Sequence, residues 1–133
     1  MSITVSIVED NDQLRATLAR VLARAEGFRF LNQYPSAEEA LKALPTEPPD
    51  VVLMDINLPG MNGFEALKVL RSDPATSQIP VVALTANALP RDRARGLKAG
   101  FFTYMTKPIK VNEFMQVLDG ALAFAGDEAA RRR

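Results

Sequence analysis

Apolar residues along this chain recur at two spacings, which alternate from one end to the other. Short β-branched or wholly apolar runs are typical of strands. Each is followed by a longer stretch with apolar residues three or four positions apart, the spacing of a helix. The runs predict strands at residues 3–8, 28–34, 51–54, 81–84 and 101–105, and the stretches predict helices at residues 14–25, 37–44, 63–70, 90–99 and 111–124.

Five repeats of strand and helix predict an α/β domain, in which helices cover both faces of a doubly wound, five-stranded parallel sheet. A barrel of eight such units needs about 250 residues, and this chain has 133. Val51–Met54 and Val81–Leu84 are apolar throughout, as expected for central strands buried on both faces. Ligands of such open sheets bind beyond the carboxyl ends of the strands, so we expect the chemistry there.

Local signals predict where several helices begin or end. Gly27 is predicted to cap the first helix, and Ser36 opens a capping-box pattern before the second. Pro90 is suited to the first position of the fourth helix, and Gly100 follows its predicted end.

Composition excludes several kinds of chemistry. Sixteen Lys and Arg residues balance sixteen Asp and Glu residues, so no net positive charge favours nucleic acid. The chain contains no His and no Cys, which excludes Ser-His-Asp catalysis, thiolate nucleophiles and zinc sites built on these residues. No export signal is present and no apolar run approaches the roughly 20 residues that span a bilayer, so we expect a cytoplasmic protein without membrane contact.

Polar residues follow the predicted strands at one edge of the sheet. Glu9 and Asp10 follow the first strand, Asp55 the third, Thr85 the fourth and Lys107 the fifth. Like charges about 4 Å apart repel by roughly 4 kcal/mol at an effective dielectric constant of about 20, so neighbouring carboxylates require positive charge. Lys107 supplies one charge. Oxygen ligands select Mg²⁺, Ca²⁺ or Mn²⁺, and Mg²⁺ is favoured because it keeps waters and leaves room for phosphate oxygens.

A carboxylate beside a divalent cation, an ammonium and a hydroxyl is suited to phosphoryl transfer. The carboxylate can attack phosphorus and become an aspartyl phosphate, while the cation and Lys107 neutralise the phosphoryl oxygens and Thr85 donates a hydrogen bond. Asp55 is the best candidate for the nucleophile because it ends an apolar strand and precedes a loop rich in Gly, Pro and Asn. Each residue alone has a plainer interpretation, such as Asp10 or Asn11 as a helix N-cap.

Four segments carry a resemblance to a known family. These segments are Ile7–Asn11, Val52–Gly63, Ala83–Ala86 and Tyr104–Ile109. Together they resemble the receiver domain of two-component response regulators, over about residues 3–125. We therefore expect a receiver domain at residues 1–125 and a polar tail at residues 126–133. The resemblance implies the flavodoxin-like, CheY-like fold with strand order 2-1-3-4-5.

The resemblance also implies a metal site and a phosphorylation site. Asp55 would be the phosphoacceptor, and Asp10 would bind Mg²⁺ directly. Glu9 would bind the ion largely through water, and the backbone carbonyl of Asn57 would complete the protein ligands. Mn²⁺ would be a possible substitute for Mg²⁺.

The remaining residues of the resemblance concern the phosphoryl group and a switch. Thr85 and Lys107 would contact the phosphoryl group, and the Lys107–Pro108 peptide would be cis. Tyr104 would turn inward as Thr85 moves toward the phosphate. The face that changes would be formed by the fourth helix, the fifth strand and the fifth helix.

The implied function is a phosphoacceptor switch in a bacterial two-component system or phosphorelay. A sensor histidine kinase or a histidine phosphotransfer protein would donate the phosphoryl group from its phosphohistidine. The receiver would catalyse this transfer and its own dephosphorylation, and a downstream protein would bind the switched face. We expect a monomer or a phosphorylation-dependent dimer, and no direct nucleic-acid binding because the chain leaves no room for a helix-turn-helix module.

Two other interpretations remain open: a phosphorylation-independent binding module on the same fold, and an engineered or chimeric receiver. A metabolic phosphotransferase is disfavoured because Asn57 stands where such enzymes usually carry a second carboxylate. Phe102 is either a core aromatic or a surface contact, and Lys110 predicts a weak start of the last helix. Asn57 and Asn87 either tune the access of water to the phosphoryl group or are plain loop residues.

Overall fold

The computed structural model describes residues 3–86, 90–107, 109–110, 112–120 and 123. Its five strands form one parallel sheet with the order β2-β1-β3-β4-β5, which confirms the predicted doubly wound fold. The elements are β1 (Ile3–Val8), α1 (Asp12–Arg24), β2 (Phe28–Tyr34), α2 (Ala37–Ala43), β3 (Val51–Asp55), α3 (Gly63–Ser72), β4 (Val81–Thr85), α4 (Pro90–Ala99) and β5 (Thr103–Thr106), and residues 112–120 form a further helical segment.

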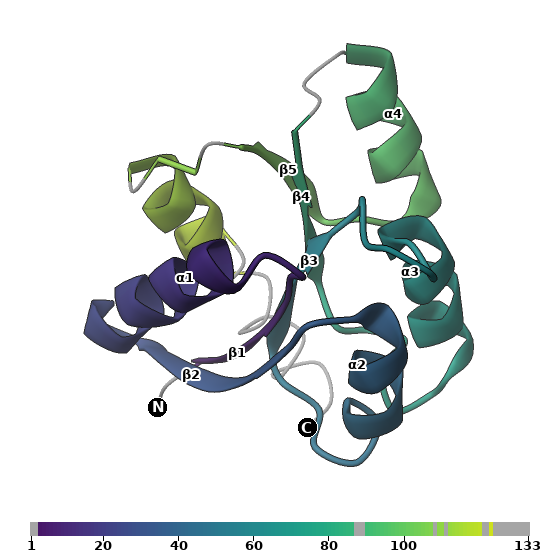
Figure 1. Ribbon diagram of the computed structural model, residues 1–133, viewed down its shortest axis with the longest axis horizontal. Coiled ribbons are helices and arrows are strands. Elements are labelled where there is room, and N and C mark those ends of the chain that lie inside the picture. The colour runs from purple at the N-terminus through teal and green to yellow at the C-terminus, as the bar shows by residue number, and fades with distance from the viewer. Residues whose placement is uncertain (1–2, 87–89, 108, 111, 121–122, 124–133) are drawn as a thin grey trace.

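Helices lie on both sides of the sheet (Figure 1). An apolar cluster fills the space on each side. α1 and the helical segment 112–120 cover one face, where Leu18 and Leu53 are buried. α2 and α3 cover the other face, where Met54 and Leu67 are buried. Leu53 and Met54 are neighbours in β3 but belong to opposite clusters, because successive side chains of a strand point to opposite faces.

The central strands end at one edge of the sheet. Every residue of β3 and β4 is buried, as their apolar runs predicted. The paired residues at the carboxyl ends are Val8 with Met54, Asp55 with Leu84, and Thr85 with Thr106. The residues that end β3 and β4 and those that follow β1 and β5 therefore gather at the edge where the chemistry was expected.

Polar side chains cap the first three helices. Asn11, rather than Asp10, is the N-cap of α1, and its Oδ1 accepts a backbone N–H at 2.9 Å. Ser36 caps α2 with one hydrogen bond of 3.2 Å, the first half of the predicted capping box. The complete box lies at α3, where Asn62 and Glu65 each accept the other's backbone N–H, at 2.9 and 3.2 Å. Within the described residues, no helix is long and apolar enough to cross a membrane.

Two helix predictions were wrong in detail. α1 ends one residue early and its C-cap is Ala25, so Gly27 is not the cap. Gly27 instead has a φ of 87° in the turn that leads into β2, a conformation that glycine adopts without a side-chain clash. α3 continues two residues beyond its predicted end, to Ser72.

The start of β5 also differs from the prediction. The strand begins at Thr103 because the preceding aromatic residues belong to the connection from α4. Phe101 is buried, and Phe102 is half-buried against the cluster on the α1 side of the sheet. Phe102 is therefore neither a fully buried core residue nor a freely exposed contact.

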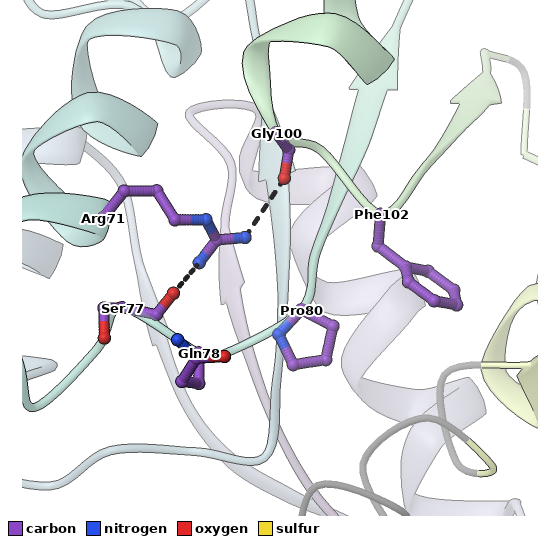
Figure 2. A pocket seen from close by; sticks show the side chains of 6 residues that line it. All are labelled: Arg71, Ser77, Gln78, Pro80, Gly100 and Phe102. Carbon is purple, nitrogen blue, oxygen red and sulfur yellow. Dashed lines mark hydrogen bonds between the residues drawn. The ribbon is translucent and has the colours of Figure 1, made fainter.

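A cavity of about 290 Å³ lies beside Phe102, at the amino ends of β4 and β5 (Figure 2). Arg71 lines it and donates hydrogen bonds to the carbonyl oxygens of Ser77 at 3.2 Å, Ile79 at 2.7 Å and Gly100 at 3.1 Å. Burial lowers the pKa of Arg71. These bonds join α3 to the starts of β4 and β5, so Arg71 has a structural role at the edge opposite the carboxylates.

Candidate functional site

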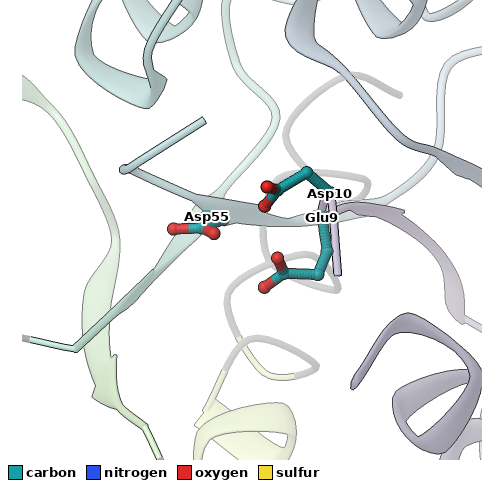
Figure 3. A group of neighbouring side chains, drawn as sticks. All are labelled: Glu9, Asp10 and Asp55. Atoms are coloured by element: carbon teal, nitrogen blue, oxygen red, sulfur yellow. The ribbon is translucent and has the colours of Figure 1, made fainter. Parts of the chain in front are cut away.

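The carboxylates that follow β1 and end β3 lie together beyond the edge of the sheet. Glu9, Asp10 and Asp55 each offer one oxygen atom, and these three atoms lie within 4.8 Å of one another. Figure 3 shows Glu9 and Asp10 at the end of β1, beside Asp55. Glu9 and Asp55 are buried and Asp10 is exposed, so the cluster is open to solvent on one side.

Lys107 joins this cluster from the residue after β5. Its Nζ atom donates a hydrogen bond to Asp55 Oδ2 at 3.0 Å and forms an ion pair with Glu9 Oε1 at 2.9 Å. The Lys107 backbone N–H donates to the Thr85 carbonyl oxygen at 2.7 Å, which fixes the lysine to the end of β4. The predicted convergence of Glu9, Asp10, Asp55 and Lys107 is thus confirmed.

Burial changes the acidity of two of these groups. It is the main cause that raises the pKa of Glu9 from 4.5 to about 7, and the charge of Asp55 adds to it, although contacts with Lys107 and Asn11 lower the pKa. Burial lowers the pKa of Lys107, but its contacts with Glu9 and Asp55 outweigh burial and leave the pKa above its ordinary value of 10.5. Lys107 is therefore charged at neutral pH, while Glu9 is divided between its acid and its carboxylate.

The loop after β3 orients the Asp55 carboxylate. The backbone N–H of Asn57 donates to Asp55 Oδ1 at 2.9 Å, and Ile56 N–H donates to the Leu84 carbonyl oxygen at 3.0 Å. Gly63, the first residue of α3, packs against this loop. A Cβ atom at Gly63 would lie 2.6 Å from Ile56 Cα and 2.9 Å from the Asp55 carbonyl oxygen, so glycine is required for this close approach.

The donor atoms of the cluster fit a hard divalent cation. All three are carboxylate oxygens, the ligand type that Mg²⁺ and Ca²⁺ prefer. The buried Glu9 Oε1 accepts no hydrogen bond from the described residues, and one lysine ammonium cannot balance three carboxylates. A cation bound on the exposed Asp10 side would supply the missing positive charge.

The two predicted switch residues are buried, one in β4 and one in β5. Thr85 ends β4 and is 1% exposed. Tyr104 lies in β5, is 7% exposed, and meets the ring of Phe101 edge-on at 6.2 Å between centroids. Pro108 and Asn87 lie outside the described residues, as does the tail at 126–133, so the cis peptide and the role of Asn87 stay predictions.

One contact of the site was not predicted. Arg15 in α1 donates a hydrogen bond from Nη1 to the carbonyl oxygen of Glu9 at 2.7 Å. Arg15 lies six positions after Glu9, which corresponds to no recurrent helix or strand spacing, and an arginine at a helix surface is ordinarily interpreted as a solvated charge.

Comparison with known proteins shows which family this sequence matches. The model of the response regulator receiver domain matches residues 5–119. Response regulator GacA of Pseudomonas viridiflava is 42% identical over 125 residues, which cover 93% of this chain and 56% of GacA. The polar-differentiation response regulator DivK of Brucella ovis is 38% identical over 125 residues, which cover 94% of this chain and 100% of DivK. The chain thus spans about half the length of GacA and the full length of DivK.

Solved structures show the same fold. Chemotaxis protein CheY4 of Vibrio cholerae matches with a TM-score of 0.83 and 25% identity, over 91% of this chain and 99% of that chain. The receiver domain of sensor histidine kinase PA1611 from Pseudomonas aeruginosa matches with a TM-score of 0.77 and 30% identity, over 92% of this chain and 99% of that chain. The PA1611 structure contains a magnesium ion coordinated in its active site cleft.

Proposed function

This chain belongs to the family of response regulator receiver domains, and on that premise we propose that it accepts a phosphoryl group on Asp55 in a Mg²⁺-dependent reaction. The observation that carries the proposal is the meeting of a buried carboxylate with a lysine ammonium and two further carboxylates. Lys107 lies 3.0 Å from Asp55, and Glu9 and Asp10 complete the cluster within 4.8 Å.

The donor is a phosphohistidine of a sensor histidine kinase or a histidine phosphotransfer protein. A carboxylate oxygen of Asp55 forms a bond to phosphorus while the phosphorus–nitrogen bond breaks, and the electron pair of that bond stays on the imidazole nitrogen, which takes up a proton. Asn57 N–H and Lys107 hold the two oxygens of Asp55, so the nucleophile is oriented before the donor arrives. In the dephosphorylation reaction, water attacks the phosphorus atom, and Asp55 leaves as a carboxylate while inorganic phosphate is released.

Mg²⁺ is the cation best suited to the cluster. Asp10 and Asp55 would hold it directly, Glu9 largely through water, and Asn57 through its backbone carbonyl. When bound, it would neutralise charge on the phosphoryl oxygens. Mn²⁺ shares the preference for oxygen ligands and is a reasonable substitute.

We propose that phosphorylation of Asp55 changes the surface formed by α4 and β5. Thr85 donates its hydroxyl to a phosphoryl oxygen, and Tyr104 in the neighbouring strand adjusts to its movement. The surface of α4, β5 and the helical segment 112–120 then binds a downstream protein. We propose a cytoplasmic location and either a monomer or a dimer that forms on phosphorylation. The match covers the full length of DivK, whereas GacA extends beyond the matched region.

The proposal is tested by intact-mass spectrometry after incubation with acetyl phosphate, with Mg²⁺ or with EDTA. We expect one phosphoryl adduct that requires Mg²⁺ and is absent in Asp55→Asn, while Asp119→Asn, an exposed carboxylate in the helical segment 112–120, is labelled like the wild type. Labelling of Asp55→Asn at the wild-type level would refute the assignment. If the adduct hydrolyses too fast to detect, binding of beryllofluoride, measured by amide NMR shifts, decides. A folded protein that responds to neither reagent would favour the binding module.

A further inference from the structure

Arg15 reaches from α1 back to the loop that carries Glu9 and Asp10. Its Nη1 atom donates to the Glu9 carbonyl oxygen at 2.7 Å, and its Nη2 atom forms an ion pair with Asp12. The Arg15 side chain is 15% exposed, whereas that of Asp12 is 89% exposed. The guanidinium is therefore folded against the loop instead of extending into solvent.

The Glu9 carbonyl belongs to the peptide that joins Glu9 to Asp10. The rest of Glu9 is held elsewhere: its N–H donates to the Tyr34 carbonyl oxygen at 3.0 Å, and its Oε2 accepts the Asn11 N–H at 3.1 Å. Arg15 adds the restraint on the carbonyl, and so on the plane of the Glu9–Asp10 peptide. Asp10 is exposed, and the orientation of this peptide helps to set where its carboxylate lies.

Electrostatics alone would disfavour an arginine in this place. A positive charge close to the N-terminus of a helix opposes the helix dipole, and it also repels a cation bound at Asp10. Asp12 in the first turn offsets part of this charge. A geometric role and a purely electrostatic role of Arg15 therefore predict opposite effects on cation affinity when its charge is removed.

We propose that Arg15 is a positioning residue for the cation site, acting through the Glu9–Asp10 peptide. This inference rests on the proposed Mg²⁺-dependent function. Arg15 touches neither the cation nor the phosphoryl group. The N–H groups of its guanidinium hold the loop in the conformation in which Glu9 and Asp10 face Asp55.

The test compares Arg15→Gln and Arg15→Lys with Arg20→Gln, which removes the same charge from an exposed arginine of the same helix. The Mg²⁺ dissociation constant is measured from backbone amide NMR shifts without any phosphoryl donor. Unfolding by urea in EDTA is recorded for each variant. Outer partners of metal ligands typically contribute 10–100-fold to affinity, and Arg15 acts on the backbone of a ligand, so we expect about fivefold weaker binding in Arg15→Gln.

Arg15→Lys keeps the charge but replaces the guanidinium with a single ammonium, so its affinity should lie between those of the wild type and Arg15→Gln. Arg20→Gln should bind Mg²⁺ like the wild type, within about twofold because an exposed, distant charge is largely screened. Unchanged or tighter binding in Arg15→Gln would overturn the proposal, since it would leave only the charge effect. If Arg15→Gln does not fold, wild-type affinity in Arg15→Lys would overturn it instead. Failure of the wild type itself to bind Mg²⁺ would refute the proposed function, a result distinct from any difference among the variants.

Discussion

Replacing Glu9 by glutamine should make the cation-free protein more stable above neutral pH. Glu9 is 0% exposed, and its pKa is raised from 4.5 to about 7, chiefly by burial. A group whose pKa is raised by folding stabilises the fold below its unfolded pKa, and this stabilisation is lost as the pH rises through the folded pKa. The loss therefore falls between about pH 4.5 and somewhat above pH 7. Glutamine keeps the shape of the neutral acid and carries no such dependence.

The size of the effect follows from the two pKa values. A shift from 4.5 to about 7 corresponds to about 3 kcal/mol when each unit is worth about 1.4 kcal/mol. Part of this loss already occurs below about pH 5, so about 2–3 kcal/mol remains between about pH 5 and about pH 8. The pKa of Lys107 is also raised, but from 10.5, so its contribution to stability is fully present throughout this window.

Urea unfolding in EDTA provides the measurement, with wild type and Glu9→Gln compared at about pH 5 and about pH 8. Other titrating groups are common to both proteins and cancel in the difference. We expect nearly equal free energies of unfolding at the lower pH and a variant more stable by about 2 kcal/mol at the higher pH. Parallel pH dependences of the two proteins would show that the Glu9 carboxylate is not disfavoured by its burial. Mg²⁺ should stabilise the wild type more than the variant at the higher pH.

Three further substitutions, one of them with a matched control variant, test the packing and the charge around the site. Gly63→Ala places a Cβ atom 2.6 Å from Ile56 Cα and should destabilise by about 1–3 kcal/mol. Gly120→Ala meets its nearest side chain only at 4.0 Å and should be tolerated; equal losses in urea unfolding would contradict this reading. Phe101→Ala removes a ring that meets two aromatic neighbours edge-on, at 5.5 and 6.2 Å between ring centroids. This variant should lower the free energy of unfolding by about 3–5 kcal/mol. A loss below about 1 kcal/mol would show that the ring is dispensable. Lys107→Met should slow labelling by acetyl phosphate by about 10²-fold. It should also tighten Mg²⁺ binding, because it removes an ammonium that repels the cation. Weaker Mg²⁺ binding would contradict this charge repulsion.

Much of the fold was predictable because its signals are local. The apolar runs of β3 and β4 require burial on both faces, and alternation of strands and helices requires parallel pairing. Parallel strands bring their carboxyl ends to one edge, so Asp10, Asp55 and Lys107 converge although they are far apart in the sequence. The identity of the phosphoacceptor was an inference from chemistry and resemblance, and the geometry agrees with it without testing it.

The remaining features depend on tertiary contacts that no local pattern encodes. Arg15 contacts the Glu9 carbonyl across the β1–α1 loop, a pairing set by where α1 packs on the sheet. Phe102 is half-buried because the α4–β5 connection leaves it between the cluster on the α1 side and a cavity. Gly27 resembled a helix cap, but the turn into β2 determines its positive φ.

Burial of Glu9 makes the proton and the cation competitors for one carboxylate. The fold holds Glu9 by its N–H, its side chain and its carbonyl, and the residue is fully buried. It is therefore either protonated or compensated, and Lys107, which is shared with Asp55, compensates only part of its charge. A divalent cation removes the remaining penalty and so binds more tightly as the pH rises through about 7, the pKa of Glu9. The same burial that weakens the cation-free fold above neutral pH thus strengthens its response to the cation.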